Sequence, residues 1–310
     1  MTAILCKINL ALLILWSCLA SAAVVNVEFK FTPFTGDPAK DEKVTSVPGK
    51  AKVFINDIPL LEQDVEKQEK MVLFAAREIS ASVWIVARSL GSTVRKGQNT
   101  IRIEFEPTDA KAPYRAQLRW ASVLDRATEK SGPGRVEATN QGDEGVDDKQ
   151  GTGKIVFQRD FTADFAKDQP WHHYPAVTAL SADDKQRLGS LMQKRTEAFK
   201  PNFAEVYKML EGIENIDVAW MRKAGCLENA YAAGVRVSAS SVDNLEFVMT
   251  GKPEVVVRAK NGLLYPSDPK AFERIKGGEL RMCAHISLFV AYPPRLIVVR
   301  TPAGAWEVVN

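Results

Sequence analysis

The residues best able to do chemistry lie near the end of the chain, where Cys283, His285 and Ser287 occupy alternate positions. The composition of residues 279–291 predicts a strand, and a strand would place this thiol, imidazole and hydroxyl on one face. Same-face neighbours on a strand lie roughly 7 Å apart, so direct proton transfer from Cys283 to His285 would require a bend. The alternative is a half-buried structural histidine beside a structural cysteine.

An enzyme built on this face would use His285 as its general base. Ser287 is the second catalytic candidate, and Tyr265 and Glu246 are candidate helpers. Elsewhere the sequence has no GxSxG elbow, no GxGxxG fingerprint and no phosphate-binding Walker loop. The sequence therefore names no reaction, and it predicts no cofactor.

The cysteines divide into an early pair, Cys6 and Cys18, and a late pair, Cys226 and Cys283. In an oxidising compartment the late pair would form a disulfide. The two residues are 57 positions apart, for which the chain-entropy model gives a stabilisation of roughly 4 kcal/mol. We expect this bond to join a helical layer to a sheet and to remove Cys283 as a nucleophile.

Two adjacent histidines, His172 and His173, lie in a segment that also contains Trp171 and Tyr174. Imidazoles bind Zn²⁺ or Cu²⁺, but successive side chains of an extended segment point to opposite sides, and no third ligand has suitable spacing. We therefore predict no metal site here and expect the aromatic rings to pack between two domains. The candidate ligand-binding residues of the whole chain are Trp171, Tyr174, Tyr231, Tyr265, His285 and Trp306.

The start of the chain has the layout of a secretory signal peptide over residues 1–22. It contains Lys7, an apolar stretch at 8–16, and small residues that end at Ala22. We expect a mature protein that begins near residue 23 or 24 and is periplasmic or secreted. A lipoprotein acylated at Cys18 is the alternative.

The charge of the chain is nearly balanced, with 41 basic and 38 acidic residues that alternate along the sequence. Because no basic run with interleaved aromatic residues occurs, the sequence argues against nucleic-acid binding. No run after the signal peptide is apolar enough to span a membrane, so we expect no transmembrane segment in the mature chain.

Residues 24–165 are predicted to form an antiparallel β-sandwich, because apolar and polar residues alternate and no helical pattern intervenes. The turn and strand at 95–103 are similar to sequences of immunoglobulin-like and jelly-roll modules. Residues 131–153, with six glycines and few apolar side chains, are predicted to be a mobile loop. Residues 166–180 are the expected interdomain linker. The predicted strands are 25–31, 51–55, 82–88, 101–106, 115–123 and 154–161.

Residues 181–310 are predicted to form an α+β domain, so the chain as a whole is mainly β with an α+β part. Three helices are expected first, followed by strands and one short helix that Asp268 caps and Pro269 begins. This element order is similar to α+β rolls of the cystatin or nuclear-transport-factor-2 kind, in which a curved sheet wraps a helix around a conical pocket. The predicted strands are 245–249, 254–259, 279–291, 295–300 and 305–309.

Three classes of function are compatible with these features. The leading hypothesis is an exported, non-catalytic binding or interaction protein, whose C-terminal roll holds a small apolar ligand and whose partner is a protein or a small molecule. The second is an enzyme with His285 as general base. The third is a structural component of the cell envelope.

Overall fold

The structure is a computed structural model, and the protein is mainly β, with antiparallel sheets and a smaller share of helix. Residues 1–21 of the predicted signal peptide, which include Cys18, lie outside the described residues. Among the described helices none is long and apolar enough to cross a bilayer. The structure describes residues 22–73, 77–132, 135–211, 213 and 216–309.

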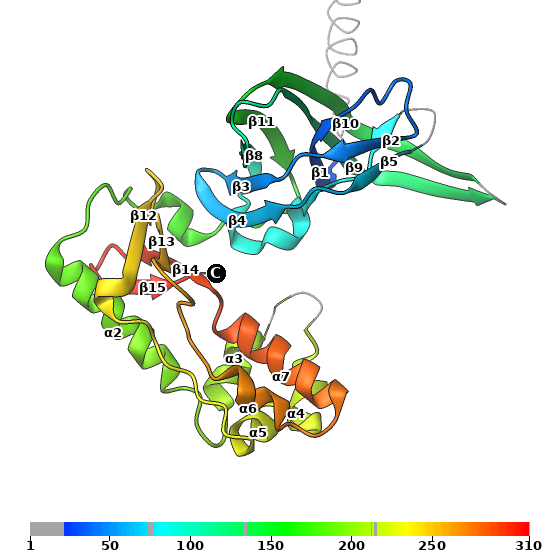
Figure 1. Cartoon of the computed structure of the whole chain (residues 1–310). Helices are drawn as coiled ribbons and strands as arrows, with labels where there is room; N and C mark the ends of the chain where they lie inside the picture. Colours follow the sequence, from blue (N-terminus) through cyan, green and yellow to red (C-terminus); the bar gives the residue numbers. More distant parts are fainter. Residues whose placement is uncertain (1–21, 74–76, 133–134, 212, 214–215, 310) are drawn as a thin grey trace, which may run out of the picture.

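Two antiparallel sheets form the N-terminal half (Figure 1). The larger sheet follows the order β10-β9-β1-β2-β5-β6, and β7 pairs with β1 outside this path. Its strands are β1 (Val24–Thr35), β2 (Lys43–Ser46), β5 (Glu69–Leu73), β6 (Glu78–Ile79), β7 (Val83–Val86), β9 (Tyr114–Gly132) and β10 (Arg135–Gly151).

The smaller N-terminal sheet has four strands in the order β11-β8-β3-β4, so β4 is an edge strand. A short 3₁₀ helix, η1 (Ala87–Thr93), connects β7 of the larger sheet to β8 of the smaller sheet. The strands are β3 (Gly49–Ile55), β4 (Ile58–Val65), β8 (Gly97–Pro107) and β11 (Ile155–Ala163).

One apolar core is shared by both N-terminal sheets. Val27, Phe29 and Phe31 alternate along β1, and all three are fully buried. The Phe29 ring lies 5.2 Å from the ring of Phe161 in β11, and the Phe31 ring lies 5.8 Å from that of Phe105 in β8. The alternation seen in the sequence therefore places large side chains between the sheets.

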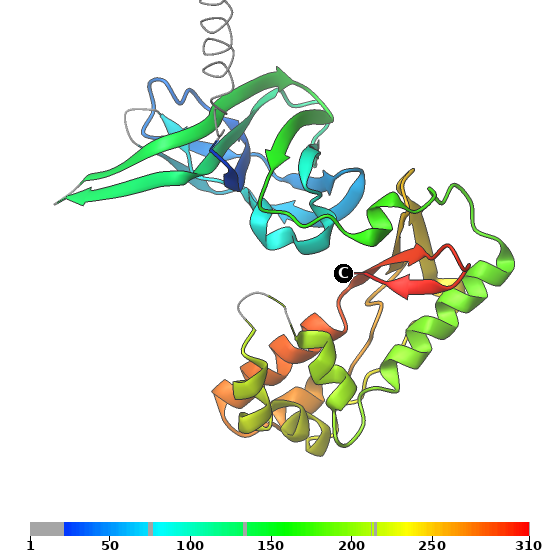
Figure 2. The same cartoon turned by 180° about the vertical axis from the view of Figure 1, so that it is seen from behind.

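The loop predicted at 131–153 is wrong for residues 135–151, which form β10 and pair with β9 in a long hairpin (Figure 2). Polar contacts replace apolar burial here, because Asp143 accepts hydrogen bonds from Trp120 at 3.1 Å and from Arg159 at 2.6 Å. At Gly145 an added Cβ would lie 2.5 Å from the Trp120 ring, so this strand requires a glycine there. Glycines are typical of loops, whereas Gly145 lets β10 pack closely on the Trp120 ring.

The C-terminal half contains an antiparallel sheet of four strands in the order β12-β13-β14-β15. The strands are β12 (Leu245–Met249), β13 (Glu254–Ala259), β14 (Arg295–Arg300) and β15 (Trp306–Val308). The helical elements are η2 (Pro170–His173), α2 (Ala182–Thr196), α3 (Ala204–Leu210), α4 (Val218–Ala224), α5 (Cys226–Ala232), η3 (Val242–Asn244), α6 (Pro269–Glu273) and α7 (Gly278–Ala291).

The start of α2 is a capping box. The Ser181 hydroxyl accepts from the Asp184 backbone N–H at 3.1 Å, and the Asp184 carboxylate accepts from the Ser181 N–H at 3.0 Å. The same carboxylate accepts from Trp306 Nε1 and pairs with Arg300. Burial raises the pKa of Asp184, but the hydrogen bonds from Ser181 and Trp306 and the charge of Arg300 outweigh it, so the pKa falls to about 2.

The strand predicted at 279–291 is wrong, because these residues form the helix α7. The side chains buried along α7 recur at helical spacing and pack against helices α3, α4, α5 and α6. The C-terminal sheet consequently has four strands rather than the five predicted. The buried residues of α7 are Cys283, Ala284, Ser287, Leu288 and Ala291.

The C-terminal sheet contributes to two separate cores through its two faces. Val255 and Val257 in β13 belong to the core made with the helices, whereas Val256 between them belongs to the core of the N-terminal sheets. In β14, Leu296 belongs to the core made with the helices, and Ile297 belongs to the core of the N-terminal sheets. Because alternate residues of a strand point to opposite faces, this sheet joins the two halves of the chain.

Candidate ligand-binding groove

The face of the C-terminal sheet that points toward the N-terminal half is the floor of a groove of about 750 Å³. Two rows of side chains cross this floor, each with one residue from β12, β13 and β14. In the apolar row, Val248 is paired with Val256, and Val256 with Ile297. In the charged row, Glu246 is paired with Arg258, and Arg258 with Arg295.

The walls of the groove are mostly apolar and come from both halves of the chain. A ligand lying on the floor would therefore be covered from two sides by side chains that are distant in sequence. The wall residues are Lys52, Phe54, Pro59, Leu60, Leu61, Glu62, Ser89, Leu90, Thr93, Phe289, Pro293 and Pro294. The volume falls in the range of small-molecule sites, and an apolar lining with a few charged groups is typical of them.

The charged row contains one satisfied arginine and one without a partner. Arg258 donates to Glu246 at 2.7 Å and lies 3.9 Å from Glu62. In the described part of the chain, the Arg295 guanidinium makes neither a hydrogen bond nor an ion pair. Burial, and then the positive charge of Arg258, lower the pKa of Arg295.

A buried ion pair holds the two halves together beside the groove. Glu254 is 2% exposed, and its two carboxylate oxygens accept from Arg95 Nη2 at 2.8 and 2.9 Å. The Arg95 Nη1 group donates to the backbone oxygen of His172 at 3.4 Å, and His172 Nε2 lies 3.2 Å from the backbone oxygen of Ser92. The Ser92 hydroxyl donates to the backbone oxygen of Val309 at 2.7 Å. These contacts fix the position of the floor relative to the walls.

The catalytic candidates His285 and Ser287 lie on different sides of α7. The His285 ring is exposed and stacks on Phe272 with a centroid distance of 4.0 Å. Ser287 is fully buried, and its hydroxyl donates to the sulfur of Met221 at 3.4 Å. Residues two apart on a helix point in nearly opposite directions, so the expected shared face of thiol, imidazole and hydroxyl does not exist.

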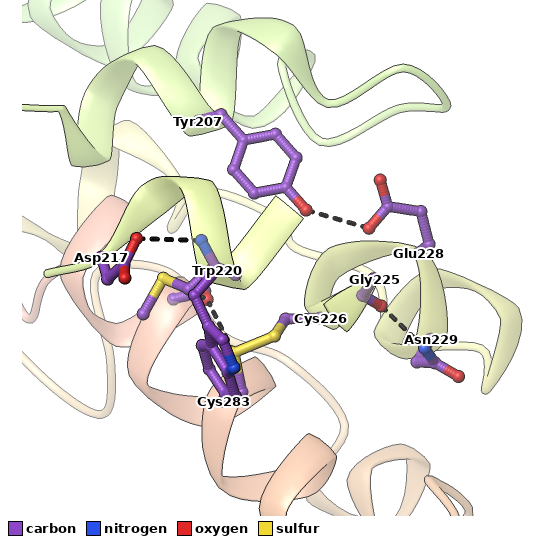
Figure 3. Close-up of a disulfide and its surroundings, with 10 residues drawn as sticks. Tyr207, Asp217, Trp220, Gly225, Cys226, Glu228, Asn229 and Cys283 are labelled. Atoms are coloured by element: carbon purple, nitrogen blue, oxygen red, sulfur yellow. Dashed lines mark hydrogen bonds between the residues drawn. A yellow bond between two sulfur atoms is a disulfide. The ribbon is translucent and has the colours of Figure 1, made fainter. Parts of the chain in front are cut away.

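The disulfide between Cys226 and Cys283 is present, with 5.7 Å between the two Cα atoms (Figure 3). It joins α5 to α7, so it connects two helices rather than a helix and a sheet as predicted. Beside it, Tyr207 donates to Glu228 at 2.9 Å, and burial together with this hydrogen bond raises the pKa of the Tyr207 hydroxyl. Cys283 is therefore unavailable as a nucleophile in this structure.

Most of the aromatic candidates for ligand binding pack within the protein and away from the groove. The Tyr265 hydroxyl donates to the sulfur of Met192 at 3.3 Å, although one side of the residue lines a hollow of about 330 Å³ together with His285. The Tyr231 ring contacts the Phe199 ring edge-on, with a centroid distance of 5.7 Å. No groove contact is made, among the described residues, by Trp171, Tyr174, Tyr231, Tyr265, His285 or Trp306.

The two adjacent histidines lie in the 3₁₀ helix η2 rather than in the extended segment expected. Both rings reach the same carboxylate, since His173 Nε2 lies 2.9 Å and His172 Nδ1 lies 3.3 Å from an oxygen of Asp168. Among the described residues, no three His, Cys, Asp or Glu side chains are arranged to hold a metal ion. The Trp171 ring contacts the His172 ring edge-on at 5.8 Å.

Sequence reasoning identified one groove residue, Glu246, and missed the rest. Arg258 and Arg295 each alternate with a buried apolar residue, Val256 and Ile297, along strands that the sequence does predict. An arginine in such a position faces the same side of the sheet as its buried neighbour. An arginine that alternates with buried apolar residues along a predicted strand therefore indicates a charged group in a partly apolar site.

No family model matches this sequence, and neither the curated proteins nor the solved structures include a significant match to it.

Proposed function

We propose that this chain is an exported, non-catalytic binding protein whose groove between the two halves holds a small, mainly apolar ligand. In this proposal the two N-terminal sheets are a β-sandwich of immunoglobulin-like or jelly-roll-like type, and they present β3, β4 and η1 as walls. The C-terminal sheet supplies the floor, a site different from the interior of the predicted roll.

The groove itself is the observation that carries this proposal. Its apolar row and the wall residues Phe54, Leu61 and Leu90 line one volume of about 750 Å³. Covering the exposed parts of these side chains with an apolar ligand would contribute about 25 cal/mol for each Å² of apolar surface removed from water.

Export is supported by the disulfide. The disulfide joins the two cysteines that follow the predicted signal peptide, and disulfides persist mainly in oxidising compartments. Amino-terminal sequencing of the native protein tests this part, with a first residue near Ala23 or Val24 as the expected result. An intact Met1 would contradict export, and an acylated Cys18 would contradict a first residue near Ala23 and indicate an exported protein anchored to a membrane.

A neutral fluorescent dye, N-phenyl-1-naphthylamine, tests the groove. We expect saturable binding with a stoichiometry of one, because the dye is apolar and of suitable size for the volume. The variant Val248→Phe places a larger side chain on the floor and should weaken binding at least tenfold. Its matched control is Val146→Phe, since Val146 is 45% exposed on β10 and far from the groove.

Thermal unfolding of both variants shows whether each one folds. Dye binding that is equal in wild type and Val248→Phe would place the dye elsewhere and contradict the groove as the site. Non-saturable binding of the dye to the wild type would contradict the binding function as a whole.

A further inference from the structure

The two arginines in the charged row of the groove differ in their ion-pair partners. Arg258 is bracketed by Glu246 and Glu62, and Glu62 also pairs with Lys50 at 3.0 Å. Arg295 on β14 is paired with Arg258 on β13, and the charge that acts on Arg295 is the like charge of Arg258. The row therefore presents one guanidinium that no protein acceptor in the described residues satisfies.

An arginine that lies partly out of water without an acceptor is unfavourable, because it has lost hydration and gained no hydrogen bond. Arg295 is half-buried and lines the groove, so an anion inside the groove could reach it. A carboxylate fits the planar guanidinium by two parallel hydrogen bonds, which is the strong geometry for this pair.

The apolar row lies two residues away from the charged row along each of the three strands. Arg295 and Ile297 are two residues apart on β14, which corresponds to roughly 7 Å. A ligand whose anionic end meets Arg295 would thus have its body over the apolar row, against Leu61 and Phe54 of the wall. Both ends of such a ligand find matching groups in one groove.

The charges of the surroundings favour a single negative charge. The two arginines of the charged row are opposed by the carboxylates of Glu246 and Glu62, and Lys52 adds one further positive charge at the wall. With these three positive and two negative side chains the lining has a net charge of one positive unit. One negative charge on a ligand neutralises it, whereas a dianion such as a phosphate monoester would leave an excess negative charge in the groove.

We infer that the ligand of the groove is a monocarboxylate amphiphile, with its carboxylate on Arg295 and its apolar body on the row of Val248, Val256 and Ile297. This inference rests on the proposed binding function and specifies the chemical class of the ligand.

The test compares two probes that differ only in the head group, decanoate and 1-decanol, as competitors of N-phenyl-1-naphthylamine at pH 8. Decanoate is ionised at this pH, because carboxylic acids titrate near pH 4 to 5. We expect wild type to bind decanoate roughly tenfold or more tightly than 1-decanol, which corresponds to about 1.4 kcal/mol for a tenfold ratio.

The variant Arg295→Gln should lose this preference while its affinity for 1-decanol stays within about twofold. The matched control Arg187→Gln removes an equal charge from an exposed arginine on α2 that pairs with Asp183, and it should keep the preference. Comparable affinity of wild type for the two probes would overturn the inference and leave the binding function standing. Failure of both probes and of the dye to bind would overturn both. The wild-type comparison decides the question even if Arg295→Gln does not fold.

Discussion

Removal of the disulfide by the double substitution Cys226→Ala and Cys283→Ala should destabilise the protein without changing the groove. The bond closes a loop of 57 residues between α5 and α7. For this loop length the chain-entropy model gives about 4 kcal/mol of stabilisation, because an uncrosslinked unfolded chain has more conformations. The sulfur atoms are buried, so loss of their packing adds to this value.

Urea unfolding, followed by circular dichroism under non-reducing conditions, measures this loss as a change in the free energy of unfolding. The control is Ser287→Ala, which alters a buried side chain next to the disulfide and leaves the crosslink intact; its cost should be about 1 kcal/mol or less. Dye affinity of the folded double variant should equal that of wild type, because the disulfide is not part of the groove. A loss below about 1 kcal/mol in the double variant would refute the reasoning that the crosslink stabilises the helices.

Three further predictions concern the ion pair, the capping box and the hairpin. Glu254→Gln leaves the Arg95 charge buried without a counterion, so the free energy of unfolding should fall by about 3 kcal/mol or more, measured by urea titration. Asp184 has a folded pKa of about 2, below its ordinary 3.8, so its contribution is complete above about pH 4 and is lost as pH falls toward 2. Asp184→Asn should therefore make the urea midpoint less dependent on pH between 2 and 5, and an unchanged slope would contradict this account. Gly145→Ala should lower the melting temperature because its Cβ would meet an indole ring, whereas Gly151→Ala, with no atom within 4 Å of the added Cβ, should have little effect.

Local signals in the sequence predicted many of the elements. Ser181 and Asp268 mark the starts of α2 and α6, as their side chains cap the helices. Gly225 separates α4 from α5 with φ of 70°, a conformation that favours glycine. The disulfide was predictable because the predicted signal peptide contains the other two cysteines. In each case the controlling interaction lies within a few residues or depends on residue type alone.

The error at α7 has a physical cause in the composition of that segment. Ile286, Phe289 and Val290 favour strands, and alternation of Cys283 and Ser287 with apolar residues resembles a half-buried strand. The burial of Cys283, Ala284 and Ser287 obeys helical spacing, but a mainly apolar segment fits both periods. Packing against four other helices decides the outcome, and that surface exists only in the folded protein.

The groove was beyond sequence reasoning because its parts are far apart in the chain. Phe54 and Leu61 come from the N-terminal half, whereas Arg258 and Arg295 come from strands near the end. Each residue alone has an ordinary explanation as a wall or surface side chain. Only strand register brings Arg258 beside Arg295 and shows that one of the two has no acceptor.

The contact between Ser92 and Val309 has a consequence for how the groove could open. The Val309 N–H donates to the backbone oxygen of Ile297 in β14, and the Val309 backbone oxygen accepts from Ser92 in η1. One residue therefore links a strand of the floor to an element of the wall. Moving η1 away from β14 to widen the groove would require breaking the hydrogen bond between Ser92 and Val309.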